Sequence, residues 1–114
     1  MKIRSANQGD IQTLELSGEL DYHSSPELRE KLTELTAKQA PKILVDLGGV
    51  DYMDSSGIAT FVEAFQKAKR YQGRLVLAAL TTTVRGVFEI AKLDSIFEIA
   101  PTVAEGAERL GAKV

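Results

Sequence analysis

The residues best suited to chemistry form one short segment, Met53-Asp54-Ser55-Ser56-Gly57. It follows an apolar run and precedes an amphipathic pattern, so two hydroxyl groups are expected at the start of a helix. An Asp or Ser at that position caps the unpaired amides of the first turn and complements the helix dipole. A helix start is also a natural site for an anion. The segment therefore supports two hypotheses, a structural cap and a phosphorylated serine.

Phosphorylation would use the same local geometry as the cap. A phosphate would add roughly two negative charges, held by backbone amides, without refolding the domain. A partner that docks over the helix end would meet charge that it cannot easily desolvate, and Asp54 would add to the repulsion. From the residues alone, capping is the simpler interpretation, and phosphorylation would turn the same segment into a binding switch.

Residue types that catalyse reactions or bind metals are otherwise sparse. The single histidine, His23, lies in an expected loop, where a solvated surface residue is the simpler interpretation. The chain has no cysteine, which removes thiolate nucleophiles, cysteine metal sites and disulfides. It contains no nucleophile elbow and no glycine-rich nucleotide loop, and Gly48-Gly49 alone indicates a tight turn. We therefore expect a protein that is not an enzyme and needs no cofactor.

Several aspartates lie in or beside expected loops: Asp21, Asp46, Asp51 and Asp54. Clustered carboxylates can bind magnesium, usually with help from substrate phosphates. Without such a substrate, carboxylates at these positions are more often solvated loop residues or helix caps. We therefore expect no metal site.

Composition narrows the class of protein further. A chain of 114 residues with 44% hydrophobic and 26% charged residues suits one compact domain that needs no metal or disulfide. A net charge of -2 with interspersed signs argues against binding to nucleic acid. No long apolar run and no signal-peptide core are present, so we expect a cytoplasmic protein without membrane insertion.

Hydrophobic periodicity and turn residues predict closely spaced elements that alternate in type. In chain order these are strands over 1–6 and 11–17, a helix after a Ser24–Glu27 capping box, a strand over 42–47, a loop over 48–53, a helix from Asp54 to near Gly73, a strand over 75–80, a helix from Thr81 or Thr82 to Ala91, a strand over 96–99 and a helix after a Thr102–Glu105 capping box. This order predicts a single α/β domain over residues 1–114, with a mixed sheet of about five strands and four helices.

The arrangement resembles the STAS family, and within it the bacterial anti-sigma factor antagonists. The resemblance covers nearly the whole chain. It rests on Gly18-Glu19-Leu20-Asp21, on the strand Ile43–Leu47, on Val50–Gly57 running into a helix, on the strand Arg74–Leu77 and on the helix region 84–93. The D-S-S-G motif is weak alone, but it gains specificity from G-E-L-D about thirty residues earlier and from the matching length.

The resemblance implies that Ser55, directly after the aspartate, is the phosphoacceptor, with Ser56 its neighbour in the cap. It implies two enzymes as partners, a serine-kinase anti-sigma factor that modifies the protein and a metal-dependent serine phosphatase that restores it. Unphosphorylated protein, a monomer when free, would sequester the kinase and release a sigma factor or another target.

The resemblance also implies that Asp21 lies near the phosphorylation site and shapes the partner surface. The family pattern departs at Ser24-Ser25-Pro26, where threonine and alanine are usual, and this change concerns the helix start and partner specificity. The residues expected at the partner surface are Asp21, Asp54, Ser56, Gly57 and Thr60, with Glu63 and Lys67 further along the helix.

Two alternative interpretations stay open. In one, the chain is a non-switching STAS subunit of a stress-signalling scaffold or of a lipid or anion transporter complex, although the retained serine favours the switch. In the other, it is a receiver-like domain with Asp54 as the phosphoacceptor. Receivers resemble one another in an acidic pair after the first strand and a lysine after the last. Here Ser5-Ala6-Asn7 and Ala100-Pro101 occupy those places, which disfavours this interpretation.

Overall fold

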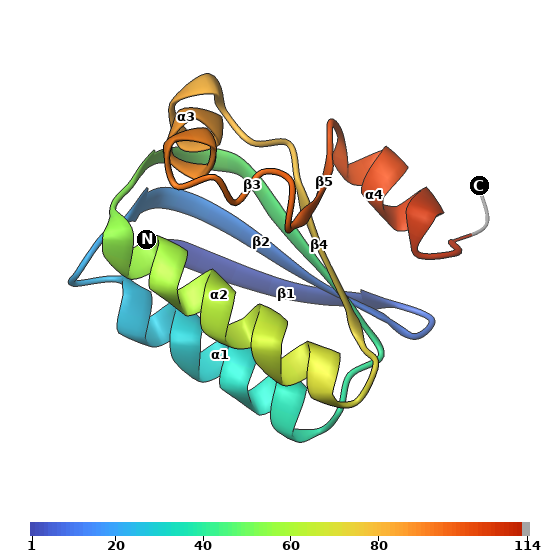
Figure 1. Ribbon diagram of the computed structural model, residues 1–114. Coiled ribbons are helices and arrows are strands. Elements are labelled where there is room, and N and C mark those ends of the chain that lie inside the picture. The colour runs from blue at the N-terminus through green and yellow to red at the C-terminus, as the bar shows by residue number, and fades with distance from the viewer. Residues whose placement is uncertain (113–114) are drawn as a thin grey trace.

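The computed structural model describes residues 1–112 and contains a five-stranded sheet and four helices (Figure 1). The elements are β1 (Lys2–Gln8), β2 (Ile11–Leu20), α1 (Ser25–Ala37), β3 (Lys42–Met53), α2 (Ser55–Arg70), β4 (Arg74–Ala78), α3 (Thr82–Ile90), β5 (Glu98–Ala100) and α4 (Val103–Arg109). The strands lie in the order β1-β2-β3-β4-β5, with β1 antiparallel to β2 and the other pairs parallel. The predicted α/β fold with a mixed sheet is confirmed.

The sheet has a hydrophobic layer on each face. On one face α1 and α2 lie side by side (Figure 1), and Ile43 and Val45 of β3 pack into the core beneath them. On the other face, Leu44 packs with Ile11 and with Leu110, which follows α4. Successive residues of a strand point to opposite faces, so a strand that is covered on both sides needs an unbroken apolar run.

The predicted loop over 48–53 is wrong, because these residues belong to β3 and pair with the end of β2. β3 carries one extra residue at each of two irregularities, opposite Glu15–Ser17 and Gly18–Glu19. Such bulges interrupt the alternation of a strand without ending it. Gly49 lies at the first of them, where an added Cβ would lie 2.9 Å from the carbonyl oxygen of Leu16. The Gly48-Gly49 pair, which lies at a bulge, therefore has the sequence pattern of a tight turn.

Other strand boundaries differ by a few residues. β1 and β2 end at Gln8 and Leu20 instead of 6 and 17, β4 covers 74–78 instead of 75–80, and β5 covers 98–100 instead of 96–99. The chain turns after β4 because Ala79 adopts a left-handed φ of 61°. The amides of Ile96 and Phe97 both donate to the carbonyl of Leu93, which forms a turn before β5.

Neither predicted capping box is complete. Ser24 precedes α1 but its side chain makes no capping hydrogen bond, because its Oγ donates to the carbonyl of Glu19 at 2.7 Å instead. Thr102 does cap α4, since its Oγ1 accepts from the amide of Glu105 at 3.1 Å. The Glu105 carboxylate, however, pairs with Arg109 rather than reaching back to the helix start. In both cases a nearby donor or acceptor competes with the reciprocal bond of the box.

Two helical glycines have opposite surroundings. An added Cβ at Gly57 would lie 2.7 Å from Met53 Cγ and 2.9 Å from Leu20 Cγ. Gly57 therefore lets the first turn of α2 approach the ends of β2 and β3 closely. At Gly86 in α3, an added Cβ would have nothing within 4 Å. Gly86 therefore weakens its helix without permitting any close contact.

We expect Gly57→Ala and Gly86→Ala to change stability in opposite directions. Gly57→Ala should lower the free energy of unfolding by about 1–3 kcal/mol, because the methyl group overpacks the core. Gly86→Ala should raise it by about 0.5–1 kcal/mol, because alanine restricts the unfolded chain and favours the helix. Urea unfolding of both variants measures these changes. A Gly57→Ala variant as stable as the parent would show that the start of α2 is free to move.

Candidate functional site

Two of the predicted site residues, Asp21 and Asp54, lie where the carboxyl ends of the parallel strands meet. Leu20 at the end of β2 and Met53 at the end of β3 are register partners. The amide of Asp54 donates to the carbonyl of Leu20 at 3.2 Å, which ties the start of α2 to the end of β2. Asp21 and Asp54, which lie far apart in sequence, therefore both follow directly from paired strand ends. We call this side of the sheet the carboxyl edge.

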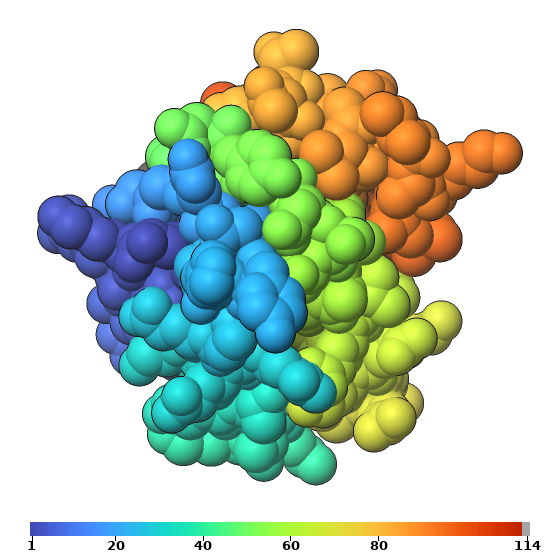
Figure 2. All heavy atoms as spheres, turned by 90° about the vertical axis from the view of Figure 1, so that its left-hand side faces the viewer, coloured from blue at the N-terminus to red at the C-terminus, as the bar shows by residue number. Residues whose placement is uncertain are grey.

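Figure 2 looks onto the carboxyl edge, where the loop between β2 and α1 lies against the start of α2. The starts of α1, α2 and α3 all follow strands that end here (Figure 1). Thr81 connects the third of these helices to the edge, since its Oγ1 donates to the carbonyl of Val50 at 3.1 Å and accepts from the amide of Val84. The edge is therefore a continuous surface built from the ends of neighbouring strands.

Asp54, and not either serine, caps α2. Its backbone is extended, with φ −110° and ψ −171°, and its Oδ1 accepts from the amide of Ser56 at 2.9 Å. Its carbonyl accepts from the amides of Gly57 and Ile58, at 3.1 and 3.3 Å. This arrangement satisfies three amides at the start of the helix, those of Ser56, Gly57 and Ile58. The predicted cap is thus present, and a single residue provides it.

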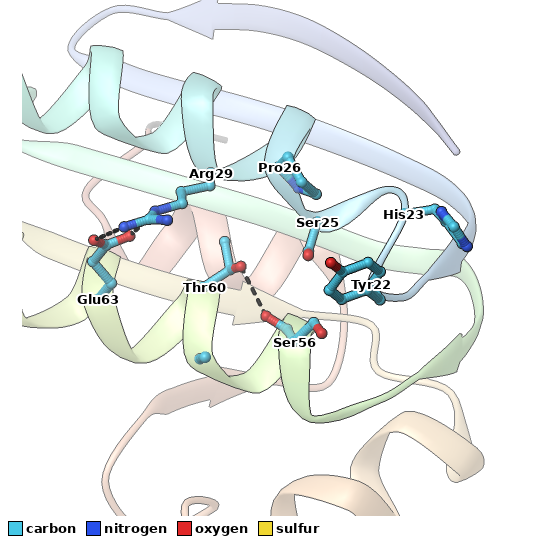
Figure 3. A pocket seen from close by; sticks show the side chains of 9 residues that line it. Tyr22, His23, Ser25, Pro26, Arg29, Ser56, Thr60 and Glu63 are labelled. Atoms are coloured by element: carbon cyan, nitrogen blue, oxygen red, sulfur yellow. Dashed lines mark hydrogen bonds and ion pairs between the residues drawn. The ribbon is translucent and has the colours of Figure 1, made fainter.

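The two serines differ in access. Ser55 is the first residue of α2 and is exposed, and its hydroxyl group forms no hydrogen bond with any residue in the range 1–112. Ser56 is half-buried, and its carbonyl accepts from Thr60 Oγ1 at 2.8 Å (Figure 3). A protein partner can therefore reach the hydroxyl of Ser55 without disturbing the cap.

Asp21 holds the loop before α1 in shape. Its Oδ1 accepts from the amides of His23 and Ser24, at 2.9 and 3.0 Å. In turn, the amide of Asp21 donates to Ser24 Oγ at 2.9 Å. The hydrogen bond from the Ser24 amide is the main reason that the pKa of Asp21 lies below its ordinary value. The carboxylate thus stays ionised and acts on the surface chiefly by fixing the loop.

A groove of about 660 Å³ opens between α1 and α2 beside this loop (Figure 3). Its lining residues are Tyr22, His23, Ser25, Pro26, Arg29, Ser56, Ala59, Thr60 and Glu63. Of the residues expected at the partner surface, Ser56, Thr60 and Glu63 line this groove, and Thr60 lies on its floor with 6% exposure. Gly57 is buried and contributes by letting the helix pack closely.

An ion pair between α1 and α2 crosses the groove. Arg29 donates from Nε and Nη2 to the two carboxylate oxygens of Glu63, at 2.7 and 2.9 Å (Figure 3). The hydrogen bond from Arg29 lowers the pKa of Glu63 and raises the pKa of Arg29. Lys67 approaches the same carboxylate at 3.7 Å. Glu63 and Lys67, both expected to contact a partner, are thus already engaged with each other and with α1.

Sequence reasoning missed Tyr22 and Arg29. The side chain of Tyr22 is 75% exposed, and its ring meets the ring of His23 edge to face, with centroids 5.6 Å apart. An aromatic residue in an otherwise polar loop was the signal that could have identified it. For Arg29 the sequence carries no comparable signal, because its partner Glu63 lies 34 residues away.

Asp46, one of the four aspartates considered in the sequence, has a structural role. Asp46 accepts from the amide of Gly48 at 2.9 Å and so supports the irregular part of β3. Within residues 1–112, no group of three or more histidine or acidic side chains is placed to hold a metal ion. Over the same range, no helix combines the length and the apolar character required to cross a membrane.

Comparisons with known proteins bear on the whole of this fold. A family model described as "STAS domain" matches residues 2–106. The anti-sigma-B factor antagonist of Bacillus subtilis is 37% identical over 102 residues, which is 90% of this chain and 92% of that protein. The protein of the same name from Staphylococcus aureus is 28% identical over 99 residues, 87% of this chain and 92% of that protein.

Solved structures show the same fold. The anti-sigma factor antagonist SpoIIAA in its unphosphorylated form superposes with a TM-score of 0.85 at 24% identity, covering 99% of each chain. An anti-sigma factor antagonist from Mycobacterium paratuberculosis gives a TM-score of 0.89 at 20% identity, covering 97% of this chain and 94% of that one. The phosphorylated form of SpoIIAA from Bacillus gives 0.77 at 23% identity, covering 96% and 99%. The resemblance found in the sequence is confirmed: this chain belongs to the STAS domain family.

Proposed function

We propose that this protein is an anti-sigma factor antagonist whose binding is switched by phosphorylation of Ser55. The observation that carries the proposal is the free, exposed hydroxyl of Ser55 on a helix start that Asp54 caps independently. Relatives that are 37% identical are named for this function, which supports the same conclusion. The serine can therefore change its charge while the structure that presents it stays in place.

Cycling between the unphosphorylated and the phosphorylated form requires two enzymes as partners. A serine-kinase anti-sigma factor binds the unphosphorylated protein and thereby releases its own target. The kinase transfers the γ-phosphoryl group of ATP to Ser55 Oγ, so that ADP leaves and a base of the kinase takes the hydroxyl proton. A metal-dependent serine phosphatase returns the serine by hydrolysis. This chain provides the phosphate acceptor and the docking surface and is not itself an enzyme. Because the kinase uses cellular ATP, phosphorylation and dephosphorylation take place in the cytoplasm.

The hydrogen bonds of α2 determine how a phosphate on Ser55 would act. The amides of Ser56, Gly57 and Ile58 already donate to Asp54. Instead of being held by these amides, as the sequence suggested, the phosphate stays on the surface beside the Asp54 carboxylate. A kinase site over Ser55 contains nucleotide phosphates, so the new charge of roughly −1.5 to −2 meets like charge across the interface. Release of the partner then needs no change in this fold.

We expect the purified serine-kinase anti-sigma factor of the same organism, with Mg-ATP, to add one phosphate to this protein. Intact mass and peptide mapping should place it on Ser55, because that hydroxyl is exposed. Ser55→Ala should gain no phosphate, whereas Ser56→Ala should still gain one. A wild-type chain that neither binds nor accepts phosphate from this kinase would favour the non-switching subunit of a scaffold or transporter.

Charge at residue 55 should weaken binding to the same kinase. We expect Ser55→Asp to raise the dissociation constant at least about tenfold, which corresponds to about 1.4 kcal/mol. Ser55→Asn is the matched control, since it has nearly the same size and no charge, and it should bind more tightly than Ser55→Asp. Isothermal titration calorimetry compares the two variants. Equal affinities for Asn and Asp would show that bulk, and not charge, controls the interface.

The free energy of unfolding distinguishes the residue that caps α2 from the residue that we propose is phosphorylated. Because Asp54 provides the cap, Asp54→Ala should lower the free energy of unfolding by about 1 kcal/mol. Ser55→Ala should change it by less than about 0.5 kcal/mol, as expected for an exposed residue without a structural contact. Urea unfolding of the two variants tests this difference. If Ser55→Ala lowered the free energy of unfolding as much as Asp54→Ala does, Ser55 would be part of the helix cap.

A further inference from the structure

Tyr22 stands on a loop that the protein holds rigid. Asp21 accepts from two amides of this loop, and Ser24 Oγ donates to the carbonyl of Glu19 at 2.7 Å. The amide of Ser25 donates to the carbonyl of Asp21 at 2.8 Å, which closes the loop onto α1. The same loop leaves the ring of Tyr22 75% exposed. An aromatic side chain on a fixed backbone loses little conformational freedom when it binds a partner.

The contacting rings of Tyr22 and His23 border two hollows that differ in chemistry. On one side lies the groove between α1 and α2, to which Pro26 and Ala59 contribute apolar surface. His23, but not Tyr22, also lines a second hollow, whose lining residues are Met1, Glu19, Asp21, His23, Ser24 and Glu27. The contacting rings of Tyr22 and His23 together thus border an apolar groove and an acidic hollow (Figure 3 shows the groove).

The acidic hollow is lined by the carboxylates of Glu19, Asp21 and Glu27, together with Met1. Within residues 1–112, the ion pairs of the protein do not include Glu19, Asp21 or Glu27. The half-buried carboxylates of Glu63 and Glu98, by comparison, are each paired with an arginine. Charge complementarity therefore favours a partner that brings a cation to this side of Tyr22.

We propose that Tyr22 is the aromatic anchor of the partner interface, and that it receives a segment of the kinase carrying a cationic side chain beside an apolar one. The cation of an arginine or lysine packs against the tyrosine ring and faces Glu19 and Glu27. The apolar side chain enters the groove against Pro26 and Ala59. This inference rests on the proposed function, because it specifies the chemistry of the same partner. It makes Tyr22 a specificity-determining residue.

The charge at Ser55 and the charge of the hollow then act on different parts of the partner. Ser55 faces the nucleotide end of the kinase, where added negative charge repels. The hollow faces the cationic segment, where the resident negative charge attracts and orients the encounter. Attraction at one place and switchable repulsion at the other give an interface that is both selective and reversible.

The test is the affinity for the purified serine-kinase anti-sigma factor of the same organism, measured by calorimetry with Mg-ADP bound. Tyr22→Ala should weaken binding about 30-fold or more, as expected for an aromatic hot spot. Tyr22→Phe keeps the ring and should stay within about threefold of the parent. Ile90→Ala is the matched control, because Ile90 is 86% exposed on α3 and does not line the groove. It should bind like the parent.

A second pair of variants tests the charge of the partner. Glu19→Gln combined with Glu27→Gln should weaken binding and flatten its dependence on salt between low and high ionic strength. Glu89→Gln combined with Glu108→Gln removes the same charge from exposed positions outside the hollow and should leave the salt dependence unchanged. Equal salt dependence in the two double variants would rule out a cationic segment at the hollow.

The results separate this inference from the proposed function. If the wild-type chain binds the kinase and accepts phosphate on Ser55, but Tyr22→Ala binds equally well, Tyr22 is not an anchor and the proposed function stands. If Tyr22→Phe loses as much affinity as Tyr22→Ala, the partner recognises the hydroxyl group and the ring-stacking contact is wrong. If the wild-type chain neither binds nor is phosphorylated, the proposed function itself fails. Equal melting temperatures confirm that the variants remain folded.

Discussion

The parallel pairing of the ends of β2 and β3 is the constraint on which the site depends. Register partnership between Leu20 and Met53, continued by the hydrogen bond from the Asp54 amide to the Leu20 carbonyl, aligns two chain segments that diverge immediately afterwards. One continues into the loop of Asp21 and the other into α2. Because both strands point the same way, their carboxyl ends deliver loops and helix starts to one edge, where a partner can contact them together.

At the start of α2, different residues provide the close packing and the helix cap. Gly57 carries no side chain, so the helix can begin directly against the strand ends. Asp54 accepts from the amides of Ser56, Gly57 and Ile58, so the cap does not use the hydroxyl of Ser55. A residue with no role in the fold can be modified without a penalty in stability. The residues that shape the start of α2 are therefore different from Ser55, the proposed phosphoacceptor.

The same separation holds in the loop before α1. The Asp21 carboxylate is engaged in holding the backbone, so the residue beside it, Tyr22, is free to project from the surface. An exposed aromatic ring on a rigid loop is unfavourable for an isolated protein in water and favourable at an interface. Here too, a structural carboxylate supports a neighbour whose side chain is directed outward. Asp21 and Asp54 thus have parallel roles on the two sides of the carboxyl edge.

The sequence by itself determined the alternation of strands and helices, the family and the segment around Ser55, because periodicity, turn residues and short motifs are local signals. It could not determine that residues 48–53 continue β3, since a bulge is defined by pairing with another strand. Nor could it show that Asp54 alone caps α2, or that Arg29 meets Glu63 across a separation of 34 residues. Exposure of Tyr22, the groove and the unpaired acidic hollow are likewise relations between distant segments, and only the tertiary structure brings those segments together.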